Sequence, residues 1–326
     1  MTLTIGGTER AVQDSRADFF AVRSDCAGSV DLSVRLGSLV LDVPVMPASG
    51  CFGPELGRLI PIGEVGATVT KTVFAGSRGG NPAHRLTEVA AGMVNSVGIP
   101  SRGARGYLEH LQSAYEALEV PTIISVGGHR PDEYAPIVVE LGDAGAAFEL
   151  NVSCPNLDRD GVDIGADPEA ITRVVSAVRD VTDRPLIVKL PAMTSSIAEC
   201  AIAAEAAGAD ALCVANSIPA LPIDPLTRRP ALGNVIGGLS GPSVRPIVLR
   251  LVWLASRAVG IPIIACGGVE SADSALEYFS VGASAVQVGT ANFARPFVMV
   301  DIVRELKTRC RLAEVSTIAQ LLEGGR

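Results

Sequence analysis

The segment IPIIACGGVESADSALEYFSVGASAVQVGT, residues 261–290, carries the pattern on which the fold prediction depends. An apolar run at 261–265 leads into the glycine pair Gly267-Gly268, and a helical pattern at 271–281 follows. Ser271 stands where a helix N-cap is expected, and Gly282 stands where a helix C-terminus favours a left-handed residue. A second apolar run, 285–288, comes next, so the segment predicts two parallel strands joined by a helix.

Six further apolar runs of the same kind lie upstream of this segment. They occupy residues 43–48, 67–71, 122–126, 147–152, 186–190 and 211–215. Helical patterns at 167–181, 197–207 and 243–259 separate several of them, with Asp167 at one predicted N-cap and Gly208 and Gly260 at two predicted C-termini. Eight strands that alternate with helices favour an α/β fold of the closed (β/α)8 TIM barrel type. An open doubly wound sheet is the alternative if one or two of the runs are not strands.

The chain shows no linker, repeat or low-complexity tract that would divide it. We therefore expect one barrel domain over residues 1–326, in which residues 1–40 form an N-terminal extension or a lid over one end of the barrel. Two connections, 72–121 and 216–242, are too long for plain crossovers. Long structureless loops in a compact domain usually serve function, so we expect both to project at the carboxyl ends of the strands, where barrel active sites form.

The composition describes an acidic chain with an aliphatic core. Apolar residues make up 48% of it but aromatic residues only 4%, and the net charge of −8 argues against a nucleic-acid-binding or anionic-membrane-binding surface. Seven scattered cysteines without a CxxC pair, and three histidines without ligand spacing, predict a reducing cytoplasmic location and no metal site. No apolar run reaches the roughly 18 residues of a membrane span, and no signal peptide is recognisable. Four cysteines are interpreted as small buried apolar residues: Cys51, Cys200, Cys213 and Cys310.

Glycine turns follow the last two predicted strands. Gly267-Gly268 and Gly289-Thr290 precede helical segments, and a further glycine-rich stretch, 237–241, lies just upstream. Glycine lets backbone N–H groups approach an anion, and the loops after strands seven and eight are the recurrent phosphate site of barrels. The pattern therefore predicts a phosphate group on these turns, with Cys266 packing beside them; tight turns without a ligand are the alternative. No GxGxxG stretch follows a first strand, so we do not expect a Rossmann nicotinamide site.

Two lysines stand in otherwise apolar strands. Lys71 ends the second predicted strand, and Lys189 lies in the fifth. A lysine is rarely buried without a partner, so both should face an anion or the polar edge of a cofactor. The alternative is that each side chain reaches water at the barrel rim.

The stretch NVSCPN, residues 151–156, is the most informative in the chain. A strand ends in Asn151, and Cys154 then stands beside a proline, with Asn156 after it. Two amides can bind the donor and acceptor edge of a planar heterocycle. A cysteine whose thiolate is stabilised by nearby positive charge can act as a base or a nucleophile, whereas the alternative for a lone cysteine is a small buried apolar residue. Asn95, in the loop 92–100, would by itself be a turn residue.

Together these segments resemble the class 1 dihydroorotate dehydrogenases, from about residue 32 to about residue 305. The loop at 151–156 is similar to that family's Asn-x-Ser-Cys-Pro-Asn loop, in which the cysteine is the catalytic base; the membrane-linked class has serine there. Lys71-Thr72, the stretch 95–99, Lys189, Asn216-Ser217 and the glycine turns also fall at family motifs, in the expected order.

The resemblance implies an FMN-dependent oxidation of dihydroorotate to orotate in pyrimidine biosynthesis, with a role for each matching residue. Cys154 would remove a proton from C5 of the substrate, and Lys71 would contact the substrate carboxylate and the flavin. Further substrate contacts are expected at Asn95, Val97, Gly98, Ile99, Asn151, Asn156, Asn216 and Ser217. FMN contacts are expected at Ala48, Ser49, Gly50, Lys71, Thr72, Asn151, Lys189, Ala215, Gly241, Cys266, Gly267, Gly268, Gly289 and Thr290. Among these, Lys189 would lie by the N1/O2 edge of the flavin.

The resemblance also bears on the electron acceptor and on partners. Residues 156–168 and 223–230 are closer to the NAD-linked subclass, which passes electrons to a separate subunit that carries FAD and a [2Fe–2S] cluster. Such a partner is therefore expected, together with a homodimer of this chain. Departures from the family pattern occur at 219–222, Ser125, Val97 and Ile99, and they concern the acceptor, the partner surface and the substrate.

Three other functions stay open at the level of sequence. A related flavin barrel that acts on dihydrouracil or dihydrothymine also uses a loop cysteine, but it typically has histidine where this chain has Asn156. A non-catalytic flavin-binding homologue would not be expected to keep Cys154, Lys71 and Lys189 together with four asparagines. A flavin-free barrel that binds a sugar phosphate would not explain the presence of those asparagines.

Overall fold

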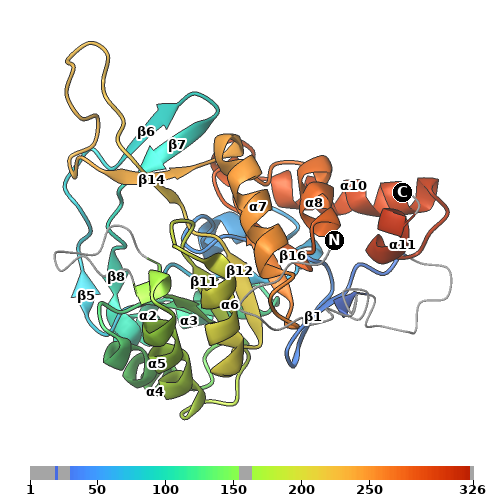
Figure 1. The fold of residues 1–326 in the computed structure, drawn as a ribbon, viewed down its shortest axis with the longest axis horizontal. Coiled ribbons are helices and arrows are strands. Elements are labelled where there is room, and N and C mark those ends of the chain that lie inside the picture. Colours follow the sequence, from blue (N-terminus) through green and yellow to red (C-terminus); the bar gives the residue numbers. More distant parts are fainter. Residues whose placement is uncertain (1–18, 21–29, 154–163, 324–326) are drawn as a thin grey trace.

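The computed structural model describes residues 19–20, 30–153 and 164–323, and its centre is a sheet of eight parallel strands (Figure 1). In spatial order these strands are β3 (Val45–Pro47), β16 (Ala285–Val288), β15 (Ile263–Cys266), β12 (Ala211–Val214), β11 (Leu186–Leu190), β10 (Ala147–Asn151), β9 (Thr122–Val126) and β4 (Thr68–Val69). The Gly66 N–H donates to the Val45 carbonyl at 2.9 Å and so links the two ends of this order. The sheet therefore closes, and the predicted (β/α)8 TIM barrel is confirmed.

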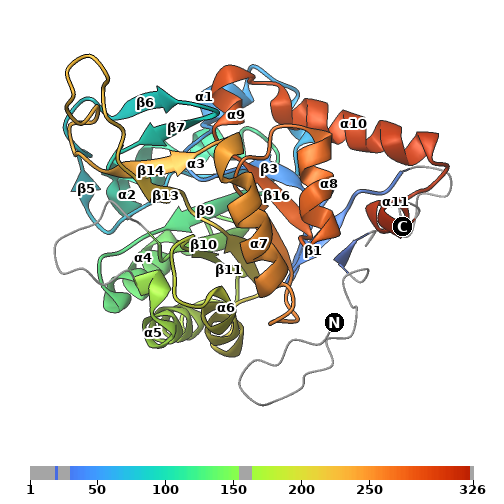
Figure 2. The ribbon, with the colours of Figure 1, turned by 45° about the horizontal axis from the view of Figure 1, so that its top comes forward.

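Helices wrap the outside of this barrel (Figure 1 and Figure 2). Their bounds are α1 (Pro54–Gly57), α2 (Gly103–His110), α3 (Gln112–Glu116), α4 (Tyr134–Leu141), α5 (Pro168–Arg179), α6 (Ile197–Ala206), α7 (Arg245–Ala255), α8 (Ala272–Ser280), α9 (Ala291–Ala294), α10 (Val298–Leu312) and α11 (Ile318–Glu323). The side chain of Asp167 caps α5 by accepting the Glu169 N–H, and that of Ser271 caps α8 by accepting the Ser274 N–H. Both predicted N-caps are confirmed, because each accepts an N–H that has no partner inside its helix.

The predicted helix C-termini are confirmed at two glycines and wrong at the third. Gly208 and Gly282 have φ of 103° and 108°, a backbone region that glycine enters without a steric penalty. Gly260 does not mark the end of α7, which stops at Ala255. The hydroxyl of Ser256 donates to carbonyls of Trp253 and Val281, at 3.2 and 2.9 Å, and fixes the end of this helix earlier than the apolar pattern indicated.

A short hairpin covers the amino-terminal end of the barrel. Strands β1 (Val34–Leu36) and β2 (Leu39–Leu41) pair antiparallel. Their buried residues pack on inward-facing side chains near the starts of the barrel strands, among them Ala67, Ile123, Ala147, Ile187, Ala211 and Ala285. The described part of the expected N-terminal extension therefore closes one end of the barrel and leaves the other end for the site.

The two long connections contain strands, so the expectation of structureless loops is wrong. The first holds β5 (Ser77–Arg78), β6 (Leu86–Val89), β7 (Gly92–Asn95) and β8 (Ser101–Arg102), and the second holds β13 (Ile218–Ala220) and β14 (Gly237–Ser240). Four of these strands form one antiparallel sheet in the order β13-β14-β7-β6, in which Asn95 pairs with Gly238 (Figure 2). The two connections thus support each other beside the carboxyl ends of the barrel strands.

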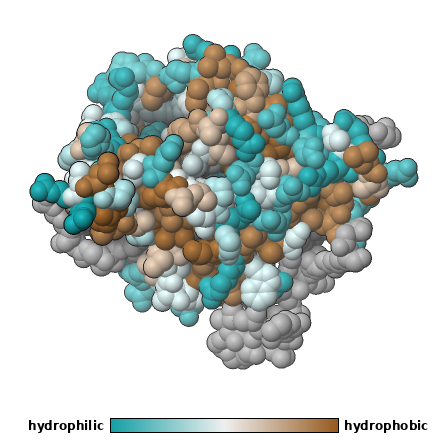
Figure 3. All heavy atoms as spheres, turned by 90° about the horizontal axis from the view of Figure 1, so that it is seen from above, coloured by the Kyte–Doolittle hydropathy of each residue, from teal (hydrophilic) through white to brown (hydrophobic). Residues whose placement is uncertain are grey.

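The surface mixes apolar and polar residues. On the face shown in Figure 3, hydrophobic residues form several patches between hydrophilic ones. Exposed large apolar side chains include Leu221, Ile223 and Leu226, which lie on the connection between β13 and β14. No helix within the described ranges combines the length and the apolar character that crossing a membrane requires.

Candidate active site

A cavity of about 370 Å³ opens at the carboxyl ends of the barrel strands. Its wall comes from the strand ends on one side and from the antiparallel sheet β13-β14-β7-β6 on the other. The structure brings most of the predicted site residues to this wall: Ala48, Ser49, Gly50, Lys71, Thr72, Asn95, Val97, Ile99, Asn151, Lys189, Ala215, Asn216, Ser217, Gly241, Cys266, Gly267, Gly268, Gly289 and Thr290.

Three predicted site residues are not placed on this wall. Gly98 has φ of 74°, and a Cβ on it would lie 2.4 Å from the backbone nitrogen of Asn81, so it serves the turn of its loop. Cys154 and Asn156 lie outside the described residues. Ser153, the residue before Cys154, is buried, and its carbonyl accepts a hydrogen bond from the Asn216 side chain at 2.6 Å. The last described residue before Cys154 is therefore held at the site.

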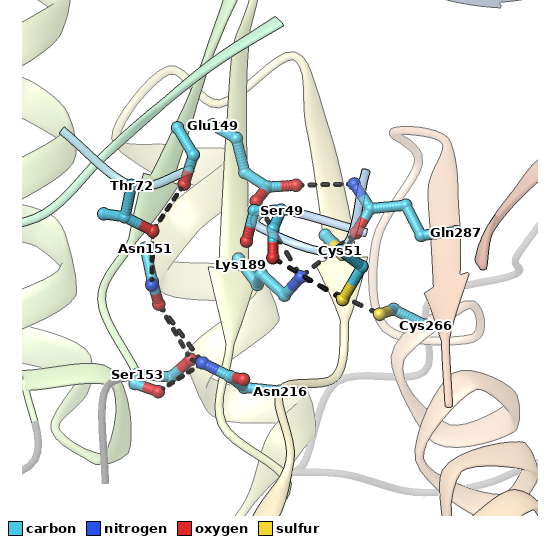
Figure 4. A network of polar contacts seen from close by, with 12 residues as sticks. Ser49, Cys51, Thr72, Glu149, Asn151, Ser153, Lys189, Asn216, Cys266 and Gln287 are labelled. Carbon is cyan, nitrogen blue, oxygen red and sulfur yellow. Dashed lines mark hydrogen bonds and ion pairs between the residues drawn. The ribbon is translucent and has the colours of Figure 1, made fainter. Parts of the chain in front are cut away.

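The asparagines at the strand ends form one hydrogen-bonded chain (Figure 4). The Asn151 amide donates to the Thr72 hydroxyl at 3.2 Å, and the Asn216 amide donates to the Asn151 side-chain oxygen at 3.3 Å. Thr72 in turn lies 3.0 Å from the Ser125 hydroxyl. These contacts join the ends of β9, β10 and β12 to the segment after β4, so the amides at the site have fixed orientations.

Asn95 reaches the site from the antiparallel sheet. Its amide donates to the Gly238 carbonyl at 3.4 Å. Gly238 is required there, because a Cβ on it would lie 2.1 Å from the Ser217 hydroxyl. Asn95 and Ser217 are far apart in the sequence, and the pairing of β7, β14 and β13 brings them to the same wall of the cavity.

Lys71 runs across a glycine on the neighbouring strand end. Gly50 has φ of 73°, and a Cβ on it would lie 2.5 Å from Cδ and 2.9 Å from Nζ of Lys71. The half-buried lysine therefore occupies the space that any other residue at position 50 would need.

Lys189 lies inside the barrel, at the wall of the cavity. It is only 3% exposed, so the alternative that it reaches water at the rim is wrong. Its Nζ donates to Oε1 of Gln287 at 3.0 Å and lies 3.8 Å from Oε1 of Glu149 (Figure 4). Nε2 of Gln287 donates to Oε2 of Glu149 at 2.6 Å. Glu149 is fully buried, so its carboxylate is held out of water and is stabilised by these two neighbours.

The thiols around Lys189 differ in their pKa values. Burial alone would lower the pKa of Lys189, but Cys213, Cys266 and Glu149 raise it above its ordinary value, so the lysine is charged. A hydrogen bond with Cys213 lowers the pKa of Cys266 to about 7, with burial acting against this and Lys189 adding to it. Burial raises the pKa of Cys51 to about 11. Cys266 is therefore the thiol in this group that ionises most readily.

The comparisons with known proteins agree with this arrangement. The family model described as dihydroorotate dehydrogenase matches residues 31–310. The chain belongs to the dihydroorotate dehydrogenase family. It is 41% identical over 300 residues to the "Dihydroorotate dehydrogenase B (NAD(+)), catalytic subunit" of Trichlorobacter lovleyi, covering 90% of this chain and 99% of that protein. Proteins of the same name from Listeria monocytogenes and Bacillus pumilus are 39% and 41% identical, covering 89% and 84% of this chain and 97% and 90% of theirs.

Membership of the dihydroorotate dehydrogenase family identifies the chain as an oxidoreductase of a flavin-dependent family. The match favours dihydroorotate over the dihydrouracil, non-catalytic and sugar-phosphate alternatives.

The glycine turns of this dihydroorotate dehydrogenase fold suit a phosphate group. The backbone N–H groups of Gly267, Gly268 and Thr290 donate to no other group in the described part of the chain. Gly268 has φ of 69°, and a Cβ on it would lie 2.7 Å from the Gly241 carbonyl oxygen. Free N–H groups that side chains do not cover are what a bound phosphate requires.

Sequence reasoning missed several members of the site, among them four that surround Lys189 or line the cavity beside it. Glu149, Gln287 and Cys213 surround Lys189, and Cys51 lines the cavity while half-buried. The interpretation of Cys51 as a buried packing residue is wrong for that reason, whereas Cys200, Cys213 and Cys310 are buried as predicted, with Cys213 also donating to Gln287. A signal for Glu149 existed, because it stands two residues before Asn151 in an apolar run, and alternate residues of a strand share a face.

Proposed function

We propose that this chain oxidises dihydroorotate to orotate with FMN as its flavin and Cys154 as the catalytic base. The observation that carries the proposal is the convergence of Lys71, Lys189, Asn151 and Asn216 on one cavity in a chain of this family. A cavity of about 370 Å³ lies in the range of roughly 300–1,000 Å³ typical of small-molecule sites.

The described residues fit FMN at two places. The free N–H groups of the glycine turns suit its phosphate, and the charged Lys189 suits the edge of an isoalloxazine ring that gains negative charge. When bound, FMN supplies the two-electron acceptor for the hydride that leaves C6 of the substrate. We assign the remaining FMN contacts to the cavity residues around these two points, including Gly50, Thr72 and Ala215.

The chain's own residues would bind the substrate and move its proton. Lys71 would neutralise the carboxylate of dihydroorotate, and the asparagines would hydrogen-bond its planar edge. With the substrate held by these carboxylate and amide contacts, the Cys154 thiolate would take the proton from C5, a step that general-base catalysis typically speeds by about 10²–10⁴-fold. Ser153 supports this assignment, because it is held by Asn216 immediately before Cys154.

We further infer that electrons leave this chain through a partner subunit that carries FAD and a [2Fe–2S] cluster, with NAD as the final acceptor. The names of the relatives support this inference, since each is a catalytic subunit of an NAD-linked enzyme. A homodimer of this chain in the cytoplasm is part of the same proposal.

The test is the visible spectrum of the purified chain under anaerobic conditions. We expect a yellow protein that dihydroorotate bleaches, with the rate of bleaching about 10²–10⁴-fold lower in Cys154→Ala and Cys154→Ser. Cys310→Ala is the matched control, because Cys310 is buried in α10, and it should bleach at the wild-type rate. Bleaching by dihydrouracil in place of dihydroorotate, or a chain that takes up no FMN, would overturn the proposal.

A further inference from the structure

Glu149 is a buried carboxylate that the proposed reaction does not use. It lies on β10 with no exposed surface, and its Oε1 has no hydrogen-bond partner among the residues that the structure describes. That oxygen lies 3.8 Å from Nζ of Lys189, while the other accepts the 2.6 Å bond from Gln287 (Figure 4). An oxygen without a hydrogen bond in the protein interior is costly, so its charge must be offset by the lysine.

The carboxylate also decides how the amide of Gln287 is oriented. An ionised carboxylate only accepts hydrogen bonds, so Gln287 must turn its NH₂ group toward Glu149. Its oxygen then faces the other way and accepts from Lys189 at 3.0 Å and from the Cys213 thiol at 3.3 Å. Glu149 thereby affects Lys189 in two ways. Its carboxylate lies beside the ammonium group, and it orients Gln287 so that the amide oxygen accepts a hydrogen bond from the lysine.

The other titratable groups around Lys189 in the described ranges are thiols, and the most acidic of them, Cys266, has its pKa lowered to about 7 and becomes a thiolate only above that pH. Within the described ranges, the thiols of Cys51 after β3, Cys213 on β12 and Cys266 on β15 face it, and Glu149 is its carboxylate partner. Lys71, two residues beyond the end of β4, lowers the pKa of Cys51 as Lys189 does. Glu149 is therefore the carboxylate that keeps Lys189 protonated before any bound ligand adds a negative charge of its own.

We propose that Glu149 is a positioning residue that keeps Lys189 charged and aimed at the flavin in both redox states, so that flavin reduction takes up no proton at this lysine. The inference rests on the proposed function, because it needs a flavin beside Lys189. A reduced flavin carries negative charge and would hold the proton by itself, whereas an oxidised flavin would not. Without Glu149, the buried lysine loses its proton in the oxidised state and regains it on reduction.

The dependence of the flavin midpoint potential on pH tests this coupling. Each proton taken up with two electrons moves the midpoint by about 30 mV per pH unit, because a tenfold change in a two-electron equilibrium is about 30 mV. We expect Glu149→Gln to steepen the slope by about 30 mV per pH unit relative to the wild type over part of the range from about pH 6 to pH 9. The control Glu199→Gln changes an exposed carboxylate on α6 and should keep the wild-type slope. A wild-type slope in Glu149→Gln overturns the inference.

Thermal unfolding of the flavin-free chain gives an independent readout. Removing one partner of a buried ion pair leaves an uncompensated charge, whereas removing both does not. The double variant Glu149→Gln/Lys189→Met should therefore unfold at a higher temperature than either single variant, and it should fold even if Glu149→Gln does not. A double variant less stable than both single variants would assign Glu149 a purely structural role.

The two proposals fail in distinguishable ways. An unchanged slope in a Glu149→Gln protein that dihydroorotate still bleaches overturns this inference and leaves the proposed function standing. A wild-type chain that binds no flavin overturns both.

Discussion

Replacing Gly50 by alanine tests whether the position of Lys71 decides catalysis. Gly50 has φ of 73°, where an L-residue costs about 1–2 kcal/mol. The new Cβ would lie 2.5 Å from Cδ of Lys71, whereas carbon atoms pack at about 3.5–4.0 Å. The lysine must therefore move by about 1 Å, which its flexible stem allows at little cost in stability. A displacement of this size at a reacting site can cost on the order of 10²-fold in rate.

We therefore expect Gly50→Ala to separate stability from activity. The Tm should fall by about 2–6 °C, as a loss of about 1–2 kcal/mol implies for a domain of this size. The kcat/KM for dihydroorotate, followed as flavin bleaching or dye reduction, should fall by about 10²-fold. Gly63→Ala is the control, because nothing lies within 4 Å of a Cβ at that position. Wild-type kcat/KM in Gly50→Ala, or an equal loss in Gly63→Ala, would refute the reasoning.

Three further variants or treatments address other parts of the site. Because its pKa is lowered to about 7, Cys266 should ionise about a unit or more earlier than an ordinary thiol, and its alkylation by iodoacetamide in the flavin-free chain should rise with a midpoint near pH 7 and level off about one to two units above it; peptide mass spectrometry measures this, and a rise that continues past pH 9 contradicts it. Thr72→Val should leave the Asn151 amide without its acceptor and lower the free energy of unfolding by about 1–3 kcal/mol in urea titrations, with Thr72→Ser close to wild type. Gly268→Ala should weaken FMN binding, measured by flavin fluorescence, whereas Gly76→Ala, which meets no atom within 4 Å, should not.

The barrel was predictable because its signal is local. Each buried strand is a short apolar run bounded by turn residues, and the predicted run 186–190 coincides with β11. The helix caps at Asp167 and Ser271 are likewise local, since each depends on an N–H two or three residues away. The end of α7 was missed because Ser256 bonds to Val281, a contact that no local pattern contains.

The site was predictable only as a set of residues and not as a set of contacts. Strand-end asparagines, lysines and glycine turns stand out in the sequence, because polar residues interrupt apolar runs there. Which of them meet depends on pairing between distant segments, such as β7 with β14. Glu149 and Gln287 are 138 positions apart, and the closure of the barrel brings their side chains together.

The hydrogen bonds within the site also bear on how much the asparagines contribute to affinity. Asn151 donates to Thr72, and Asn216 donates to Asn151 and to Ser153. A substrate that binds these amides must replace hydrogen bonds that already exist within the protein. The binding free energy gained at each amide is therefore only the difference between two hydrogen bonds. The fixed orientation of the amides is then their larger contribution, because it selects a ring whose donors and acceptors match. Affinity must come mainly from charge, and among the described residues both Lys71 and Arg295 bring cationic side chains to the cavity wall, while the charge of Lys189 is offset by Glu149.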